Sequence, residues 1–171
     1  MKPFLIFLAV LLSVFSRTAD AQTADAIFQQ ACGPKEAAFN VQQVKTPPPA
    51  APDPGKALVY IIQKQSGTDF ITRVGLDGAW AGVILRDSYI SVSVAPGEHH
   101  ACVAAQDRKH PQTELLHFTA EAGKTYYYLV RGIAAAGYSR SFAAMEFGPA
   151  DRDEALFLIT SDPKSVAMNK P

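Results

Sequence analysis

The segment FITRVGLDGAWAGVIL, residues 70–85, decides the fold class of this chain. Two runs of β-branched and aromatic residues, 70–76 and 79–85, flank the dipeptide Asp77-Gly78. Asp-Gly accepts the positive φ angles of both central positions of a type I′ turn, so the segment predicts a two-residue β-hairpin.

The strand pattern continues on both sides of this hairpin. Residues 88–94 (SYISVSV) alternate between apolar side chains and serine, as in a strand with one solvated face. Pro96-Gly97 predicts a turn, because proline fixes φ at the second turn position and glycine accepts a positive φ at the third. Further strands are expected at residues 57–64, 98–105, 113–120, 124–131 and 139–147, with a turn at Gly123.

Helices are expected only near the two ends of the chain. Residues 23–31 predict two helical turns that end with Gly33 in the left-handed conformation. Asp151 and Glu154 resemble a capping box that opens a helix to about residue 159. Because no helices separate the strands, the sequence predicts a mostly β fold. The expected form is an antiparallel β-sandwich, Ig-like or transthyretin-like, of seven or eight strands with a short N-terminal and a short C-terminal helix.

The first 21 residues have the pattern of a secretory signal peptide. Lys2 supplies a positive start, residues 4–15 are almost all apolar, and Ala19-Asp20-Ala21 matches the small-x-small cleavage pattern. The apolar run is too short to span a bilayer comfortably, so no transmembrane segment is expected in the mature chain. Cleavage after Ala21 predicts a periplasmic or secreted protein of 150 residues, from a chain of 171.

Composition shifts divide the remaining chain. An N-terminal segment with a short helix and strand is expected at residues 22–45, and a proline-rich linker at residues 46–55. The β-sandwich domain is expected at residues 56–160, followed by a polar, flexible tail at residues 161–171. The whole chain has 16 basic and 16 acidic residues in scattered positions. That distribution excludes a basic surface for nucleic acid.

Cys32 and Cys102 are the only cysteines of the chain. In an oxidising compartment an even pair predicts a disulfide, which would close a loop of 70 residues. A redox-active or nucleophilic cysteine is the alternative. No C-x-x-C spacing supports it.

An ordered set of short motifs carries a resemblance to a known family. The motifs are GKALVYI (residues 55–61), RVGLDG (73–78), SY (88–89), PGEHH (96–100) and AGKTYY (122–127). Together they resemble the bacterial family catalogued as domain of unknown function 2846. The resemblance covers most of residues 55–160 and implies a secreted or envelope β-sandwich, with no established activity. The Pro-Gly-Glu-His turn also resembles the turn of PEGA-type extracytoplasmic modules.

The histidines are the first candidates for binding. His99 and His100 are adjacent on a predicted strand, so they point to opposite faces and cannot chelate one ion together. If Cys102 faces the core, His100 shares that face and His99 points outward, near His117. A zinc site needs three or four converging ligands, so no metal site and no cofactor is predicted.

The aromatic residues are the second candidates. Tyr126 and Tyr128 share one face of a strand and Tyr127 takes the other, which is typical of a strand packed on both sides. Their hydroxyls could also line a groove for a glycan or peptide. Trp80 beside the Asp77-Gly78 turn is either an exposed binding anchor or a cover for the sheet.

No sequence motif indicates catalysis. The chain has no G-x-S-x-G or H-E-x-x-H motif, no phosphate-binding glycine loop and no C-x-x-C pair. We therefore expect no enzyme but a structural or interaction module of the bacterial cell envelope, whose partner is an envelope protein or a glycan. The alternative is an envelope protein that binds a small ligand or metal ion through surface histidines. A third hypothesis is a hydrolase whose site, around His110 or His117, is assembled from distant residues.

Overall fold

The computed structural model of the chain describes residues 23–48, 51–65, 70–106, 112–134 and 142–168. It contains two helices and ten strands in that part of the chain. In chain order they are α1 (Ala24–Ala31), β1 (Asn40–Val44), β2 (Ala57–Gln65), β3 (Ile71–Leu76), β4 (Ala79–Leu85), β5 (Ser88–Val94), β6 (Gly97–Ala105), β7 (Thr113–Ala120), β8 (Thr125–Ala134), β9 (Phe142–Pro149), α2 (Arg152–Ser161) and β10 (Lys164–Met168).

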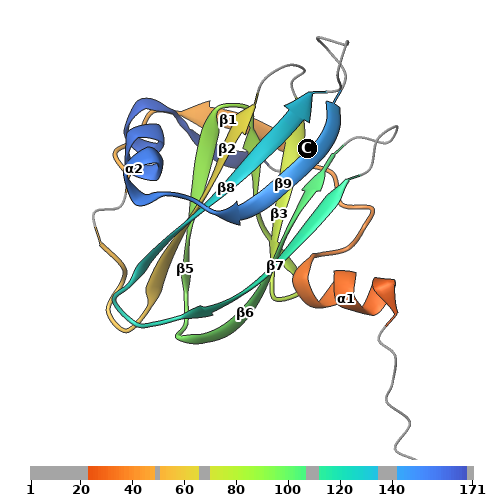
Figure 1. The fold of residues 1–171 in the computed structure, drawn as a ribbon, viewed down its shortest axis with the longest axis horizontal. Coiled ribbons are helices and arrows are strands. Elements are labelled where there is room, and N and C mark those ends of the chain that lie inside the picture. The colour runs from red at the N-terminus through yellow and green to blue at the C-terminus, as the bar shows by residue number, and fades with distance from the viewer. Residues whose placement is uncertain (1–22, 49–50, 66–69, 107–111, 135–141, 169–171) are drawn as a thin grey trace, which may run out of the picture.

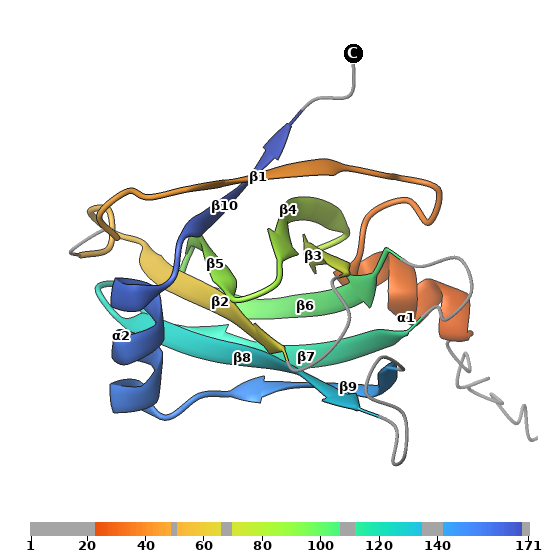
Figure 2. The same cartoon turned by 90° about the horizontal axis from the view of Figure 1, so that it is seen from above.

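The strands form two sheets that face each other (Figure 1). The larger sheet has the order β1-β10-β5-β2-β8-β9, and the smaller sheet has the order β4-β3-β6-β7. Figure 2 shows β1 and β10 on one side of the molecule and β7 and β9 on the other. The fold is therefore mostly β, with two sheets, as the sequence predicts.

The pairing is mostly antiparallel, with a parallel pair at the centre of the larger sheet. β2 and β8 run parallel from Leu58 opposite Thr125 to Gln65 opposite Gly132. β10 also meets β5 in the parallel direction, at Lys164 and Tyr89. A wholly antiparallel arrangement is thus wrong. Parallel neighbours need a long crossover connection, and here the crossover from β2 to β8 contains the whole smaller sheet.

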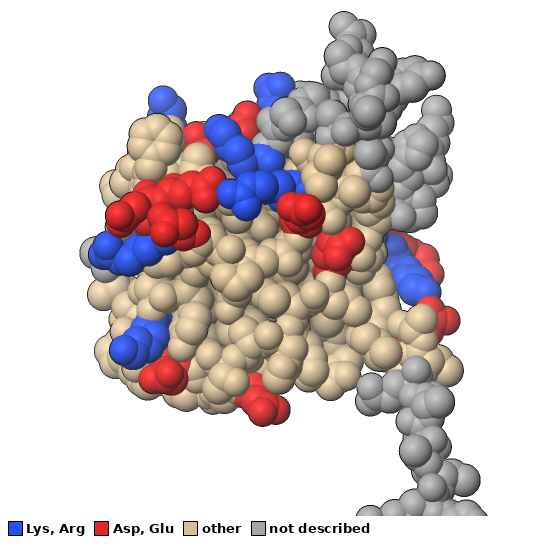
Figure 3. All heavy atoms as spheres, in the orientation of Figure 1, with Lys and Arg blue, Asp and Glu red and all other residues tan. Residues whose placement is uncertain are grey.

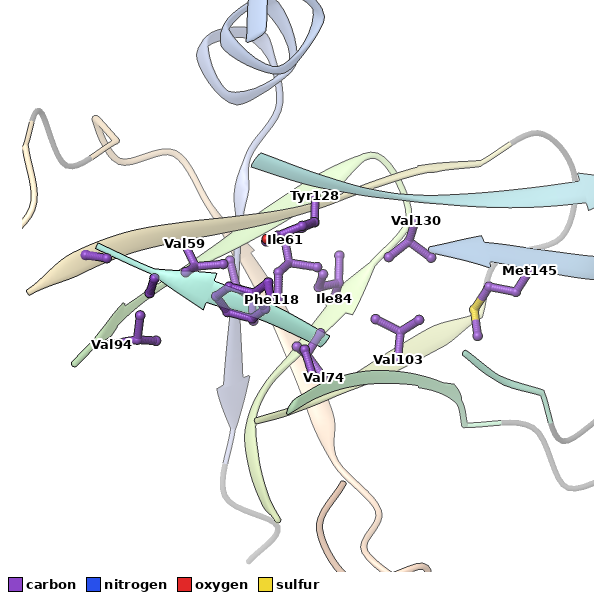
Figure 4. Close-up of a cluster of buried hydrophobic side chains, with 14 residues drawn as sticks. Val59, Ile61, Val74, Ile84, Val94, Val103, Phe118, Tyr128, Val130 and Met145 are labelled. Atoms are coloured by element: carbon purple, nitrogen blue, oxygen red, sulfur yellow. The ribbon is translucent and has the colours of Figure 1, made fainter. Parts of the chain in front are cut away.

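One buried cluster joins the two sheets (Figure 4). Val74, Val103 and Phe118 come from the smaller sheet and meet Ile61 and Val130 of the larger sheet. These positions alternate along their strands with residues of the outer faces, which is the period-2 pattern that the sequence shows.

The hairpin predicted from the opening segment is present. β3 pairs antiparallel with β4, and Leu76 lies opposite Ala79. Asp77 has φ 50° and Gly78 has φ 81°, so both turn positions are left-handed, as a two-residue type I′ turn requires. The register shifts once, between Val74 and Gly75.

Helix α2 covers the outer face of the larger sheet. Its buried Ala155, Leu158 and Ile159 pack on a second cluster that includes Leu58, Tyr60, Ile62, Tyr89 and Leu129. The Asp151 carboxylate caps the helix by accepting from the backbone N–H groups of Asp153 and Glu154. Glu154 does not complete the expected capping box, because its carboxylate binds Arg131 of β8 instead.

The flexible tail expected from residue 161 onward is wrong for β10. Residues 164–168 pair with β1, from Lys164 opposite Val44 to Met168 opposite Asn40. Ser165 is buried and its hydroxyl shares a hydrogen bond with that of Ser88. Residues 164–168 (KSVAM) are too few for a strand alternation to be recognised, and the strand is defined by its backbone pairing with β1. With β10, the described part of the chain has ten strands rather than the expected seven or eight.

Several predictions fall on residues outside the described ranges. These residues include the signal peptide and its cleavage position, part of the proline-rich linker, His110, the first part of the strand expected at residues 139–147, and residues 169–171. Among the described residues, no helix has the length and apolar character needed to cross a membrane.

Candidate functional site

The predicted disulfide is present at the outer face of the smaller sheet. Cys32 follows α1 and Cys102 lies on β6, with their Cα atoms 5.6 Å apart. Both residues are fully buried, in a cluster with Ala31 that Phe28 and Trp80 flank. The bridge therefore joins the N-terminal helix to the sheet. We call this surface, formed by α1 and residues 32–39 over the smaller sheet, the stapled face.

Gly75 provides the space for this bridge. It lies opposite Cys102 in the pairing of β3 with β6. A Cβ atom at this position would come within 2.8 Å of the Cys102 Sγ and 2.7 Å of the Cys32 Cα. The end of α1 thus rests directly on the backbone of β3, and a larger residue at position 75 would displace it.

Trp80 is covered by the N-terminal segment. Its indole N–H donates to the Pro34 carbonyl at 2.9 Å, and its ring meets those of Phe28 and Phe39 edge-on. The left-handed conformation predicted for Gly33 is wrong, because the φ angle of Gly33 is not positive. Glycine is needed there because a Cβ atom would come within 2.6 Å of the Trp80 Nε1. Of the two interpretations of Trp80, the structure supports the one in which it covers the sheet.

Two polar side chains, one on β3 and one on the residue that follows β6, hold residues 34–39. Arg73 lies over the Trp80 ring and donates to the carbonyls of Lys35 and Ala37, each at 2.8 Å. The Gln106 amide accepts from the Phe39 N–H and donates to its carbonyl, as a neighbouring strand would. Sequence analysis missed both residues, because neither belongs to a motif and their partners are backbone atoms more than 30 positions away.

His99 faces inward rather than outward. Cys102 is buried on the outer face of the smaller sheet, beneath α1, and not in the core between the sheets. The alternation of β6 therefore turns His99 toward the core, beside Phe118, and leaves it 8% exposed. The expectation failed because a buried cysteine was equated with the core between the sheets.

The two ring nitrogens of His99 both face acceptors. Nδ1 lies 2.7 Å from the Asp77 carboxylate and Nε2 lies 2.7 Å from the Ala95 carbonyl. Only the imidazolium donates from both nitrogens. Burial disfavours the charged ring, but the hydrogen bonds to Ala95 and Asp77 outweigh it, so the pKa of His99 is raised. His99 thus fastens the tip of the β3–β4 hairpin to the turn before β6.

His100 is the histidine that lies beside His117. They are direct partners in the pairing of β6 with β7, and their ring centroids are 4.8 Å apart. The His117 Nε2 is 3.8 Å from a Glu98 carboxylate oxygen, and the His100 Nε2 is 2.9 Å from the Gln30 Nε2 of α1. Gln30 was missed, although it stands two residues before Cys32 just as His100 stands two residues before Cys102. Among the described residues, no group of three or more His, Cys, Asp or Glu side chains is placed so that it could hold a metal ion.

The tyrosines lie on the two faces that the sequence predicts. Tyr126 and Tyr128 pack in the core between the sheets, and Tyr127 stacks on Tyr60 at the α2 face. Burial and the neighbouring Tyr126 raise the pKa of Tyr128 to about 12. The Tyr126 hydroxyl accepts from the Glu121 N–H. These contacts are those of packing residues rather than of a binding groove.

Both glycines of the other predicted turns have positive φ angles. Gly97 after Pro96 has φ 133° and Gly123 has φ 77°. Asp77 has a further role, because one carboxylate oxygen accepts from the His100 N–H at 2.9 Å while the other meets His99. The Asp77 side chain therefore joins the hairpin tip to both histidines of β6.

The end strands of the two sheets make different contacts on the two sides of the molecule. On one side β1 and β10 contact β4 and cover its edge. On the other side β7 and β9 contact each other, and each is the last strand of its sheet in the described part of the chain. Figure 3 shows a broad area with few charges here, below the Lys, Arg, Asp and Glu side chains of the upper rim. We call the β7 and β9 edges the open side.

Comparisons of the chain with protein-family models, with curated proteins and with solved structures find no match.

Proposed function

We propose that this chain is a secreted or periplasmic structural or interaction module of a bacterial cell envelope. The buried Cys32–Cys102 bridge is the observation that carries the proposal. Disulfides of this structural kind persist in oxidising compartments. The signal-peptide pattern of residues 1–21 supports the same location.

The fold proposed for the body is a β-sandwich of Ig-like or transthyretin-like type, in the family of domain of unknown function 2846. Two facing sheets with a shared core support the sandwich. The motifs at residues 55–61, 73–78 and 96–100 support the family, and they lie on or beside β2, β3 and β6.

The proposed partner is another envelope protein that meets the open side. An edge strand offers unpaired backbone groups to a partner strand. Leu115 of β7 is exposed on the outer face of the smaller sheet, next to this edge, because it lies opposite Cys102. Figure 3 shows few charges on that side of the molecule. A glycan partner is less favoured, since Trp80 and Tyr128, its candidate anchors, are occupied by internal contacts.

The proposed module carries out no catalytic step. A histidine that serves as a general base needs a ring nitrogen facing its nucleophile. Both nitrogens of His99 are engaged by Asp77 and Ala95. Residues 161–164 (SDPK) match the S-x-x-K pattern of some catalytic serines by letter. However, Ser161 ends α2 and donates to the Leu158 carbonyl, and Lys164 belongs to β10, so the two do not lie on one helical turn.

Intact-mass spectrometry of the protein recovered from fractions of its bacterial host tests the compartment. The proposal expects a periplasmic or secreted chain that begins at Gln22 and is two hydrogens lighter than the reduced form. A cytoplasmic chain that retains residues 1–21 and has two reactive thiols after unfolding would refute it.

Site-specific photo-crosslinking in the same host tests the open side. Leu115 on β7 and Val166 on β10 have nearly equal exposure, 44% and 43%, and form a matched pair. A crosslinker at position 115 should capture an envelope protein and one at position 166 should not. Equal capture at both positions would contradict an interaction through the open side.

A further inference from the structure

The tip of the β3–β4 hairpin carries a chemically reactive dipeptide. Asp77-Gly78 is the only Asp-Gly sequence of the chain, and the chain has no Asn-Gly. In an Asp-Gly dipeptide, the glycine nitrogen can attack the Cγ atom of the protonated aspartic acid carboxyl. The nitrogen loses its proton, one carboxyl oxygen leaves as water, and a cyclic succinimide forms. Water then opens the ring at either carbonyl and yields aspartate or isoaspartate, with no net change of mass.

The tip has the features that this reaction needs. Glycine has no Cβ atom to hinder the approach of its nitrogen. The Asp77 side chain is 45% exposed, so water reaches the carboxyl. The two reacting groups are adjacent in the chain, and no other residue has to supply a nucleophile. Whether the dipeptide reacts therefore depends on how the folded structure holds the carboxyl.

The Asp77 carboxyl is held by β6. One oxygen accepts from the His100 N–H at 2.9 Å, and the other lies 2.7 Å from the His99 Nδ1. The Asp77 N–H also donates to the His100 carbonyl at 2.8 Å. Both oxygens act as acceptors here, whereas succinimide formation needs one of them to gain a proton and leave. The hydrogen bonds with β6 thus have to break before the reaction.

His99 is a firmly placed donor for this contact. It is 8% exposed, its ring lies 5.4 Å from that of Phe118, and its Nε2 is 2.7 Å from the Ala95 carbonyl. The imidazole is held on both sides and keeps its Nδ1 directed at Asp77. His100 contributes only its backbone to the same carboxyl. The effect of His99 can therefore be separated by changing its side chain alone.

Isomerisation would alter the tip and the surface beside it. In isoaspartate the main chain runs through the Cβ and Cγ atoms, so the turn gains one backbone atom and the carboxylate moves to Cα. The residue could not keep both the φ of 50° at Asp77 and the contacts with β6. Gly78 lies against α1, where a Cβ atom would come within 2.9 Å of the Gln29 carbonyl. The change would thus reach the stapled face.

We propose that Asp77-Gly78 is a site of spontaneous isoaspartate formation, and that His99 suppresses the reaction in the folded protein by holding the Asp77 carboxyl. His99 is a positioning residue in this proposal, because it acts through Asp77. The modification goes beyond the interaction module proposed above and does not depend on it.

Incubation of the oxidised protein in heavy-oxygen water at neutral pH tests the proposal. Each ring opening adds one heavy oxygen to the dipeptide, which mass spectrometry of the Asp77 peptide detects, and electron-transfer fragmentation identifies isoaspartate. The folded unaltered protein should take up label at Asp77 at least about 10-fold more slowly than the urea-unfolded protein. His99→Gln should raise the folded rate by about 10-fold, the effect of one hydrogen bond to a charged group.

Two controls separate the contact of His99 from folding in general. Leu158→Ala weakens the packing of α2 on the larger sheet, away from the hairpin, and should leave the labelling of Asp77 unchanged. Asp87-Ser88 also has a positive φ, 42° at Asp87, and its labelling in the same digest should not respond to His99→Gln. Circular dichroism confirms that each variant is folded.

Three results would overturn the proposal. The first is equal labelling of Asp77 in the folded and the unfolded unaltered protein, a comparison that needs no variant to fold. The second is an unchanged rate in folded His99→Gln. The third is a lower rate in that variant, since His99 would then donate a proton to the leaving oxygen rather than suppress the reaction.

Discussion

The two helices of this protein are held on their sheets in different ways. Helix α1 buries only Ala31 among its own residues and depends on the Cys32–Cys102 bridge, and Arg73 and Gln106 then hold residues 34–39. Helix α2 buries three residues on the larger sheet and is capped by Asp151. A helix as short as either is marginal in water alone. The Cys32–Cys102 bond therefore holds α1 on its sheet, whereas apolar packing holds α2 on its sheet.

The largest expected effect comes from removing the bridge with Cys32→Ser and Cys102→Ser together. A closed loop of about 70 residues stabilises the folded state by about 4 kcal/mol in the chain-entropy model. Urea unfolding should show a loss of that order. In limited proteolysis, residues 24–39 should be cleaved earlier in the digestion than α2. Equal cleavage of the two helices would contradict the contrast between them.

The matching change at the other face is Leu158→Ala. Leu158 is buried between α2 and the larger sheet, so its truncation leaves a cavity and should cost about 3 kcal/mol. Hydrogen exchange should then speed up in α2 and leave α1 unchanged. The same substitution at Ile27, which is 38% exposed on α1, serves as the control and should cost under 1 kcal/mol.

A pH-dependent change is expected at the hairpin tip. The pKa of His99 is raised in the folded state, so its protonation contributes stability that is fully present below the unfolded pKa of about 6.5 and is lost as the pH rises through the folded value. His99→Gln should lower stability by about 2 kcal/mol at pH 5.5, as expected for charged hydrogen bonds, and by less at pH 9. Thermal unfolding of both proteins at the two pH values measures this, and a loss that grows with pH would show that the ring is not charged.

The smallest effect is expected at the cap of α2. Asp151→Ala removes the acceptor for two backbone N–H groups and should cost about 1 kcal/mol. Asp151→Asn keeps the acceptor and should cost less. Chemical denaturation of the pair measures the difference, and an equal loss in both variants would mean that the charge near the helix N-terminus matters more than the hydrogen bonds.

The local structure of this protein could be predicted where the signal is local. The Asp77-Gly78 hairpin, the strand β5 and the cap at Asp151 follow from neighbouring residues. The solvated face expected for β5 is wrong at its start, where Ser88, Tyr89 and Ile90 are all buried. The pairing of the cysteines follows from their number. The parallel pairing of β2 with β8 could not be predicted, because strand direction depends on partners about 67 residues apart.

The candidate sites could be predicted only in part, because they depend on which face of β6 points inward. The alternation of β6 is readable, but its direction is set by the bridge beneath α1, which reverses the expected places of His99 and His100. β10 pairs with β1 through its backbone, and Arg73 and Gln106 bind backbone atoms of distant residues. Every residue carries these backbone groups, so the sequence pattern does not show which of them will pair. The pairing of His100 with His117 is likewise set by strand register.

Hydrogen exchange of the oxidised and the reduced chain tests the central claim most directly, which is that the disulfide holds α1 while packing holds α2. After reduction, exchange should speed up strongly in residues 24–39 and stay nearly constant in residues 152–161, since α2 does not contact the bridge. Unchanged protection of residues 24–39 after reduction, or equal loss of protection in both helices, would contradict the account.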